Sequence, residues 1–321
     1  MLGELSFYRL VRDDLARVEA VLRERPSGQH PAIGDALEYL IGRGGKRIRP
    51  ILVLLSAHLC GADMDRAVWA AAGAEMLHTA TLIHDDLIDG SLMRRGAATL
   101  NSRWSPGATV LTGDYAFARA AYLIARTGSV PLTRRFAETL MVICNGEIRQ
   151  MFDGRRGEGT REEYERRIYA KTATLIALSA EAGAILAEVE GEAVRALRTY
   201  GERLGLAFQI VDDVLDFVAD EKTLGKPVGS DLRQGLVTLP TLLFLERHPD
   251  HPTVRRAIES PSPEAVDAAV RLIAGSSAID AALDEARRYI DQAVAALTPC
   301  PDGPYRAALE DLARFVVDRR F

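Results

Sequence analysis

The stretch Asp85-Asp86-Leu87-Ile88-Asp89 and its later counterpart, Asp212-Asp213-Val214-Leu215-Asp216, decide the fold and the chemistry of this chain. Each places aspartates at positions i, i+1 and i+4 of an apolar run, so that on a helix the first and third share one face. Carboxylates at this spacing repel each other, and apolar surroundings make uncompensated charge costly. Mg²⁺ can compensate, because it prefers oxygen ligands and usually binds one or two carboxylates together with substrate phosphates. We therefore expect the two clusters to face each other and to hold a diphosphate through several Mg²⁺ ions.

The composition is that of a soluble globular protein, with 48% hydrophobic and 26% charged residues among 321. A net charge of −5 gives no reason to expect nucleic acid as a partner. No stretch approaches 18 uninterrupted apolar residues, and the N-terminal region lacks the order of a signal peptide. Three widely spaced cysteines, Cys60, Cys144 and Cys300, form neither a disulfide framework nor a zinc site. We expect a cytoplasmic protein with reduced thiols.

Apolar residues recur at helical spacing along almost the whole chain, which predicts an all-α fold. No linker, fixed repeat or low-complexity tract interrupts the pattern, so we expect a single domain over residues 1–321. A polar loop is expected over 90–106, and three shorter helices are expected after Thr253. The other expected helices span 5–25, 32–42, 65–89, 107–127, 131–153, 161–189, 192–219 and 231–247, and one more begins in a turn over 44–50 and runs to about residue 60.

A basic turn, Gly44-Gly45-Lys46-Arg47-Ile48-Arg49-Pro50, precedes one of these helices. Cationic side chains and free backbone N–H groups at a helix N-terminus suit an anion, although such a run by itself fits a solvated loop better. His78 lies two helical turns before Asp85, on nearly the same face. A lone histidine among apolar residues is usually a core residue with a satisfied hydrogen bond.

Further polar residues flank the two aspartate clusters. Arg94 and Arg95 follow the first cluster, and guanidinium groups make bidentate phosphate contacts. Lys171-Thr172 interrupts an apolar helix, where a buried lysine requires a charge partner. Gln209 lies three residues before Asp212, and Lys226 lies in a loop rich in Gly and Pro, where an exposed lysine is the ordinary expectation.

Together these motifs, from about residue 40 to about residue 245, resemble the trans-isoprenyl diphosphate synthases, the polyprenyl synthetase family. The likeness is greatest to the long-chain bacterial members of the octaprenyl, heptaprenyl and solanesyl type. The resemblance implies the large helical bundle of isoprenoid synthases, with the active site in its central cavity. It also implies a prenyltransferase that condenses isopentenyl diphosphate with an allylic diphosphate. Three Mg²⁺ ions, replaceable by Mn²⁺, a homodimer, and transient membrane association for product release are implied as well.

The same resemblance assigns roles to individual residues. Those implied in catalysis are Asp85, Asp86, Asp89, Asp212, Asp213, Asp216 and Lys171, with Asp85, Asp89 and Asp212 as metal ligands. Those implied to bind isopentenyl diphosphate are Lys46, Arg49, His78 and Arg95. Those implied to bind the allylic diphosphate are Arg94, Lys171, Thr172, Gln209 and Lys226.

Chain length is expected to depend on the helix that ends at Asp85. Short-chain members of the resembled family carry an aromatic residue four or five positions before the first aspartate, where this chain has Thr81 and Ala80. Leu77 could narrow the path below them. The rise from Asp85 to Ala74 is about 16 Å at ~1.5 Å per residue, enough for three isoprene units. We therefore expect a long-chain product of the quinone side-chain type.

Three alternatives accompany this interpretation. A short-chain synthase making C15 or C20 diphosphates would keep the same motifs, with the path closed by another helix or by the partner subunit. A class I terpene cyclase shares the fold, but it carries a different second metal motif and needs no isopentenyl diphosphate site. A catalytically inactive regulatory subunit usually lacks part of one aspartate cluster, whereas both are intact here.

Overall fold

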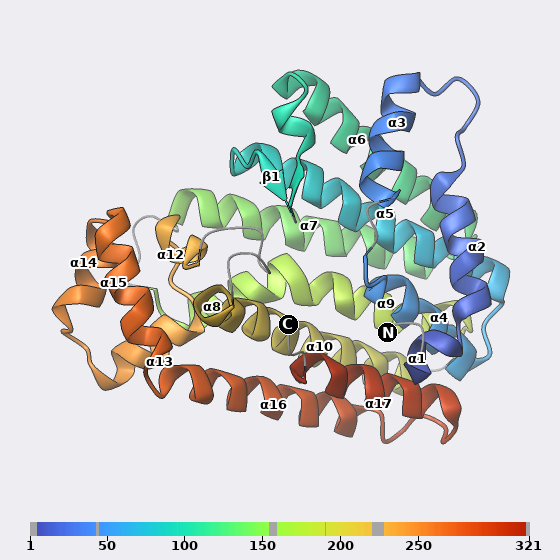
Figure 1. Cartoon of the computed structure of the whole chain (residues 1–321). Helices are drawn as coiled ribbons and strands as arrows, with labels where there is room; N and C mark the ends of the chain where they lie inside the picture. The colour runs from blue at the N-terminus through green and yellow to red at the C-terminus, as the bar shows by residue number, and fades with distance from the viewer. Residues whose placement is uncertain are drawn as a thin grey trace. The chain divides into compact units, whose positions relative to one another are not determined.

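Helices make up most of the computed structural model, which describes residues 5–42, 45–94, 96–153, 159–189, 191–219 and 228–318 (Figure 1). Within these residues, the only strands are β1, Met93–Arg94, and β2, Ala97–Ala98, which pair antiparallel. The all-α prediction is confirmed. No helix in the described part of the chain is long and apolar enough to cross a membrane.

The chain divides into two compact units. The first comprises 1–139, 175–201 and 296–312, and the second comprises 140–174, 202–295 and 313–321. Helices α7, Val130–Asp153, and α10, Gly191–Val218, contribute residues to both units. The expectation of a single domain stays a prediction.

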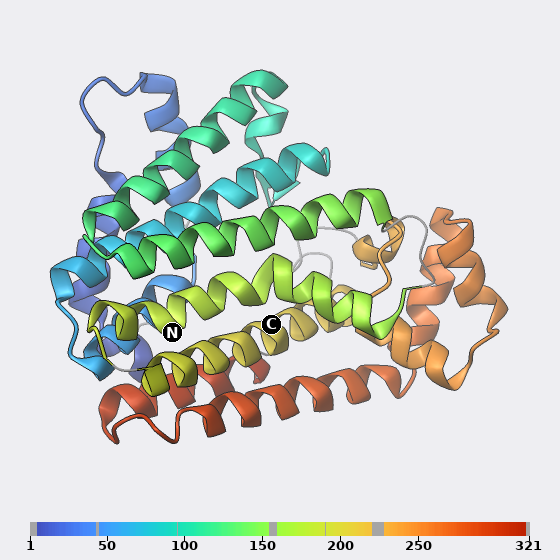
Figure 2. The ribbon, with the colours of Figure 1, turned by 180° about the vertical axis from the view of Figure 1, so that it is seen from behind.

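Helix α5, Met64–Ile88, is the centre of the first unit, and it packs against α2, α4 and α6. Alanines favour this helix, and the Asp63 side chain caps its N-terminus by accepting a 2.8 Å hydrogen bond from the Asp65 backbone N–H. Helix α6 runs beside α5 (Figures 1 and 2). Gly73 permits this approach, because a Cβ there would lie 2.9 Å from Ile124. The remaining helices of this unit are α1 Ser6–Arg9, α2 Arg12–Arg23, α3 Pro31–Gly42, α4 Ile48–Cys60, η2 Leu100–Ser102, α6 Pro106–Arg126, most of α9 Thr174–Leu186 and the beginning of α17 Pro304–Val317.

The second unit is built around the C-terminal part of α10 and the segment before α9. Helix α8, Arg161–Ile168, leads directly into a π-helical segment, Tyr169–Ala173. The later helices are α12 Ser230–Arg233, α13 Leu239–Arg247, α14 Pro252–Glu259, α15 Pro263–Ala274 and α16 Ala278–Ala296. Helices α14 and α15 pack against each other, as the orange pair in Figure 2 shows.

Several predicted helix bounds are wrong. The helix expected over 5–25 breaks after Arg9, because Val11 has non-helical backbone angles (φ −119°, ψ 16°), and a second helix begins at Arg12. The helix expected to begin in the basic turn 44–50 does begin there, at Ile48, and ends at Cys60 as expected. The helix expected over 161–189 contains the π-helical segment and ends at Leu186.

The C-terminal predictions also need correction. The helix expected over 231–247 is two helices, because Gly235 has φ +78° and a new helix begins at Leu239, with Pro240 in its first turn. Between residues 252 and 318, where the structure describes the C-terminal region, there are four helices rather than three, and the missed break lies at Gly275-Ser276-Ser277.

Candidate functional site

The first aspartate cluster lies at the C-terminus of α5. The Asp89 backbone N–H donates a 2.8 Å hydrogen bond to the Asp85 carbonyl, which is the i, i+4 relationship the spacing predicts. Asp85 is half-buried and Asp89 is exposed. Asp86 is buried and accepts a 2.7 Å hydrogen bond from Arg94 Nε. Burial raises the pKa of Asp86, and the positive charge of Arg94 partly offsets that effect.

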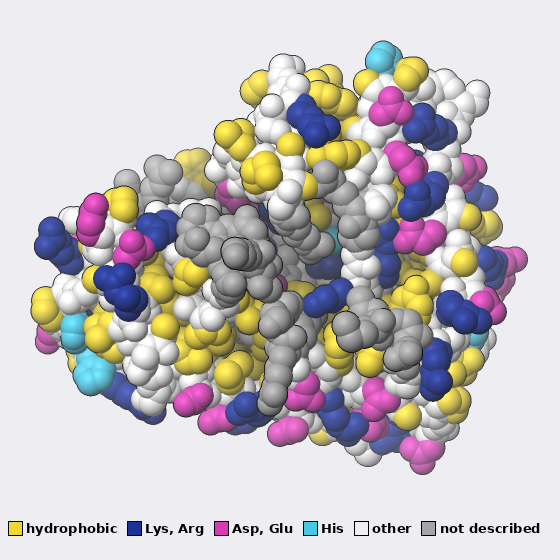
Figure 3. Space-filling model, viewed as in Figure 1, with side chains coloured by type: hydrophobic (Ala, Val, Ile, Leu, Met, Phe, Trp, Pro, Cys, Tyr) yellow, Lys and Arg dark blue, Asp and Glu magenta, His cyan; other side chains and the backbone are white. Residues whose placement is uncertain are grey.

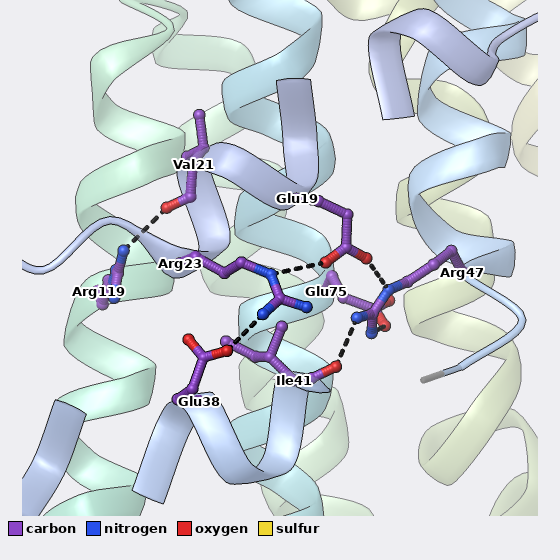
Figure 4. Close-up of polar contacts among 8 residues, drawn as sticks. All are labelled: Glu19, Val21, Arg23, Glu38, Ile41, Arg47, Glu75 and Arg119. Atoms are coloured by element: carbon purple, nitrogen blue, oxygen red, sulfur yellow. Dashed lines mark hydrogen bonds and ion pairs between the residues drawn. The ribbon is translucent and has the colours of Figure 1, made fainter. Parts of the chain in front are cut away.

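The basic turn enters α4 at Arg47, which has left-handed backbone angles (φ 49°, ψ 33°). Lys46 and Arg49, on either side of Arg47, are half-buried. The Arg47 side chain makes ion pairs with Glu19 and Glu75 (Figure 4). The turn is therefore anchored at Arg47, unlike a solvated loop. Arg95, predicted to act with these residues, lies outside the described residues.

Two histidines on α5 flank the predicted anion sites. His78 is half-buried and lies three residues after Glu75. His84 Nε2 lies 3.3 Å from the Val110 carbonyl oxygen and 3.5 Å from Asp114 Oδ1 on α6. Gly113 makes this contact possible, since a Cβ there would lie 2.2 Å from His84 Nε2.

The second aspartate cluster lies on α10 in the second unit. Asp213 is buried, and burial, followed by the nearby charge of Asp231, raises its pKa to about 8. Tyr164 Oη donates a 2.8 Å hydrogen bond to Asp213 Oδ2, and Gln209 Nε2 donates a 2.9 Å hydrogen bond to Oδ1. Asp216 is also buried and accepts a 3.1 Å hydrogen bond from the Asp231 backbone N–H. Asp212, in contrast, is half-buried.

The π-helical segment contributes two of the predicted residues. Thr172 Oγ1 donates a 2.6 Å hydrogen bond to Gln209 Oε1, which joins this segment to α10. Lys171 Nζ lies 3.3 Å from Glu147 Oε1, so the predicted charge partner is present. The prediction that Lys171 is buried is wrong, because 38% of its side chain is exposed. Lys226 lies outside the described residues.

The donor set fits a hard divalent cation. Asp86 and Asp213 are engaged by side-chain donors, whereas Asp85, Asp89 and Asp212 are more exposed. Among the described residues, no group of three or more His, Cys, Asp or Glu side chains is arranged so that it could hold a metal ion by itself. Partly exposed carboxylates suit Mg²⁺, which usually takes one or two carboxylates and completes its shell with water and substrate phosphates.

The three residues predicted to set chain length lie on α5. Leu77 and Ala80 are buried, and Thr81 is half-buried. The Thr81 hydroxyl donates a 2.9 Å hydrogen bond to the His78 carbonyl. Neither Ala80 nor Thr81 places an aromatic ring at this level of the helix.

Sequence reasoning missed the residues that hold the predicted ones in place. Tyr164, Glu147 and Glu19 contact Asp213, Lys171 and the basic turn, respectively, from other helices. Their partners are distant in the sequence, so spacing alone gave no signal. A tyrosine between charged residues, as in Glu163-Tyr164-Glu165, was the one available indication of a buried ring on α8.

Comparison with known proteins gives consistent matches along the chain. A family model described as polyprenyl synthetase matches residues 30–273. Heptaprenyl diphosphate synthase component 2 of Geobacillus stearothermophilus is 38% identical over 98% of this chain and 99% of the relative. Octaprenyl diphosphate synthase of Escherichia coli strain K12 is 38% identical over 97% of both chains. A solved polyprenyl synthase from Caulobacter crescentus CB15, complexed with calcium and isoprenyl diphosphate, is 41% identical over 98% of both chains, with a TM-score of 0.93.

Proposed function

Because this chain belongs to the polyprenyl synthetase family and is a prenyltransferase, we propose that it condenses isopentenyl diphosphate with an allylic diphosphate to give a longer all-trans polyprenyl diphosphate. Two aspartate clusters carry the proposal, each with one aspartate held by protein donors and at least one more accessible. The Caulobacter relative was solved with calcium and isoprenyl diphosphate, which are the ligand types the proposal requires.

We assign Asp85, Asp89 and Asp212 as the ligands of Mg²⁺, three ions in all, with Mn²⁺ as a possible substitute. Bound Mg²⁺ would neutralise the negative charge that develops on the departing diphosphate. Asp86 and Asp213 act differently in this proposal. Their hydrogen bonds to Arg94 and Tyr164 fix the helix ends from which the metal ligands project.

The allylic diphosphate would be bound by cationic and polar side chains near the two clusters. We assign Arg94, Lys171, Thr172, Gln209 and Lys226 to this role. Arg94 would stabilise the departing diphosphate as a fixed cation. The Thr172 to Gln209 hydrogen bond fixes the Gln209 amide, whose other end donates to Asp213, so that this polar group is preorganised.

Isopentenyl diphosphate would occupy a second site without metal ions, bound by Lys46, Arg49, His78 and Arg95. These residues present its double bond to the allylic carbon, so that much of the rate gain comes from positioning. The allylic C–O bond breaks, the new C–C bond forms, and a proton leaves to regenerate an allylic diphosphate that is one C5 unit longer. Apolar walls must keep water from the carbocation during these steps. The released diphosphate can accept the proton.

We propose a long-chain product, because curated relatives along nearly the full chain are heptaprenyl and octaprenyl diphosphate synthases. The small side chains at Ala80 and Thr81 agree with this proposal. The test is incubation with Mg²⁺, farnesyl diphosphate and excess isopentenyl diphosphate, followed by chain-length analysis of the dephosphorylated products. Products of C30 or longer are expected. Products that stop at C15 or C20 would overturn the long-chain assignment, and no elongation from any primer would overturn the proposed reaction.

We further propose that the protein is a homodimer that works in the cytoplasm and releases its product at a membrane surface. Large apolar side chains are exposed along α6 and α7, which is unusual for a monomer surface. They are Val110, Leu111, Tyr122, Val130, Met141, Ile148, Met151 and Phe152. One relative is named as component 2 of its synthase, so a different partner chain is the alternative. Light scattering on the purified chain, alone and as the Leu111→Glu variant, distinguishes a self-associating surface from one that needs another protein.

A further inference from the structure

We propose that Arg47, the arginine between Lys46 and Arg49, is a positioning residue for the isopentenyl diphosphate site. By pairing with Glu75, it fixes the start of α4 against α5 and thereby keeps Lys46 and Arg49 in register with His78. This inference rests on the proposed function, because it presumes that those three residues bind one diphosphate.

The Arg47 guanidinium joins three other helices (Figure 4). Its Nε donates a 2.5 Å hydrogen bond to Glu19 Oε1 on α2, and its Nη1 donates a 2.9 Å hydrogen bond to Glu75 Oε1 on α5. Its Nη2 donates a 2.8 Å hydrogen bond to the carbonyl of Ile41, near the end of α3. Only 13% of the Arg47 side chain and 8% of the Glu75 side chain are exposed. Each guanidinium nitrogen thus has its own acceptor, and the pair is largely shielded from water.

The backbone at Arg47 is as specifically held as its side chain. A non-glycine residue at φ 49° is uncommon, and it persists where the surrounding contacts over-determine it. The Arg47 carbonyl accepts the 3.0 Å hydrogen bond from Ile51 N–H that begins α4. Gly45 lies close to the pair, because a Cβ there would be 3.4 Å from Arg47 Nη1. The three side-chain contacts therefore determine where α4 begins and how the chain enters it.

One ion pair consequently connects the two segments that supply three proposed ligands. Lys46 and Arg49 flank Arg47 in the chain, and Glu75 lies one helical turn from His78 on α5. If the Arg47–Glu75 contact were lost, the start of α4 could shift relative to α5 without unfolding either helix. The site would then keep its charges but lose their common geometry, and binding of a diphosphate depends on that geometry.

Charges on α2 and α3 support the pair from outside. Arg23 Nε lies 3.6 Å from Glu19 Oε2, and Arg23 also forms an ion pair with Glu38 on α3. Figure 3 shows dark blue and magenta side chains interspersed over α2 and α3 on this face of the unit. Glu19 therefore makes ion pairs with two arginines, Arg23 and Arg47. Glu75 is the more buried of the two carboxylates that pair with Arg47.

The alternative is that Arg47 only stabilises the fold, and a pair of variants separates the two roles. Arg47→Met alone leaves Glu75 buried with its main cationic partner removed, which destabilises a protein strongly. Arg47→Met combined with Glu75→Leu removes both charges and should restore most of the melting temperature. Arg47→Lys keeps the charge but lacks the planar fork that reaches three acceptors, and serves as the milder variant.

The matched control is Arg17→Met. Arg17 also bridges α2 and α5, through Asp14 and Asp65, but it is 44% exposed and remote in sequence from the basic turn. Three kinds of measurement are made on each protein. They are the melting temperature, the Kd of isopentenyl diphosphate by calorimetry without Mg²⁺, and the KM of each of the two substrates.

We expect the double variant and Arg47→Lys to raise the Kd and KM of isopentenyl diphosphate by about tenfold to a hundredfold, the same range as the loss of metal affinity or activity when groups that orient metal ligands are removed. The KM of the allylic diphosphate should stay within about twofold of wild type, since only one site loses its geometry. Arg17→Met should change neither. A double variant that recovers both the melting temperature and the affinity for isopentenyl diphosphate would overturn the positioning role of Arg47. It would leave the assignment of the isopentenyl diphosphate site itself unaffected. A wild-type protein that binds no isopentenyl diphosphate would overturn the assignment of the site itself.

Discussion

The hydroxyl of Tyr164 donates a 2.8 Å hydrogen bond to Oδ2 of Asp213, and both side chains are buried. The Gln209 amide occupies the other oxygen of the same carboxylate. The middle aspartate of the second cluster is therefore part of a hydrogen-bond network within the protein. The other two aspartates of the motif have different environments. Asp212 is half-buried, and Asp216 accepts a hydrogen bond from the backbone N–H of Asp231.

Tyr164→Phe tests this network. Phenylalanine keeps the ring, including its packing near Arg167, and removes only the hydroxyl. Asp213 would then retain one side-chain donor. Removing the partner of a buried acceptor lowers the stability of a protein by about 1–3 kcal/mol. We expect the free energy of unfolding, measured by urea titration, to fall by that amount. Tyr169→Phe is the control, because the Tyr169 hydroxyl makes a 3.3 Å hydrogen bond to the half-buried Glu202. Equal losses in the two variants would contradict a special role for Tyr164.

Local patterns account for what the sequence predicted correctly. The 3.6-residue period identified the all-α class and the extents of α3, α5, α6 and α7 to within about two residues. The i, i+4 spacing placed Asp85 and Asp89 on one face because that relationship depends only on helix geometry. The requirement for a charge partner predicted the contact of Lys171 with a carboxylate. It did not predict that the Lys171 side chain is exposed.

Contacts between distant segments account for what could not be predicted. Tyr164 and Asp213 are 49 residues apart, and Arg47 is 28 residues from both Glu19 and Glu75. No spacing rule links such residues, since their proximity follows from how helices pack. The π-helical segment at Tyr169–Ala173 was also missed, and it too is in close contact with a segment that is distant in the sequence. Gly205 lets α10 approach that segment so closely that a Cβ there would lie 2.4 Å from Ala173 Cα.

Gly113→Ala tests the contact between α5 and α6 at His84. A Cβ at residue 113 would lie 2.2 Å from His84 Nε2, so the imidazole must move. Overpacking of this kind costs about 1–3 kcal/mol of unfolding free energy. In a His84→Ala background, Gly113→Ala should instead raise the free energy of unfolding, because alanine is favoured over glycine within a helix by about 1 kcal/mol.

Gly107→Ala is the control for this pair, since it lies on the same helix and a Cβ there meets no atom of the described chain within 4 Å. We expect it to be neutral or stabilising in both backgrounds, as measured by urea unfolding. If Gly113→Ala costs the same with and without the His84 side chain, another neighbour must be responsible for the close contact.

Cys60 provides a pH-dependent test of burial. Burial raises the pKa of the Cys60 thiol to about 11, and the nearby Cys300 adds to the effect. The thiolate is the reactive form, and its fraction at pH 8 would be about 10⁻³, compared with roughly a quarter for an ordinary thiol of pKa near 8.5. We expect the iodoacetamide alkylation rate at Cys60 to rise about tenfold per pH unit between pH 8 and 10.

The alkylation rate is followed by mass spectrometry in the Cys144→Ser variant, which removes the exposed thiol. A short unstructured cysteine peptide, measured alongside, has an ordinary thiol pKa near 8.5 and should reach its plateau at about pH 10. Near-ultraviolet circular dichroism at each pH verifies that the protein stays folded. A plateau for Cys60 at the same pH as the free thiol would show that its environment is far more solvated than the structure indicates.

Ala80→Phe tests the proposed path of the growing chain. Ala80 is 2% exposed on α5, five residues before Asp85. If the space beside it receives the product, the phenyl ring can occupy that space and block elongation. We expect the products made from farnesyl diphosphate to shorten by several C5 units while kcat for the first condensation stays near wild type. Chain lengths are read from the dephosphorylated products.

Ala71→Phe is the matched control, because Ala71 is also a fully buried alanine on α5, farther from the aspartates. There the ring must displace packed side chains, at a cost of about 1–3 kcal/mol. If a product path runs beside Ala80, Ala80→Phe should cost less than this, because the ring would enter that path. An Ala80→Phe variant that is as destabilised as Ala71→Phe, and that makes products of unchanged length, would mean that Ala80 packs against the core and that another surface limits the chain.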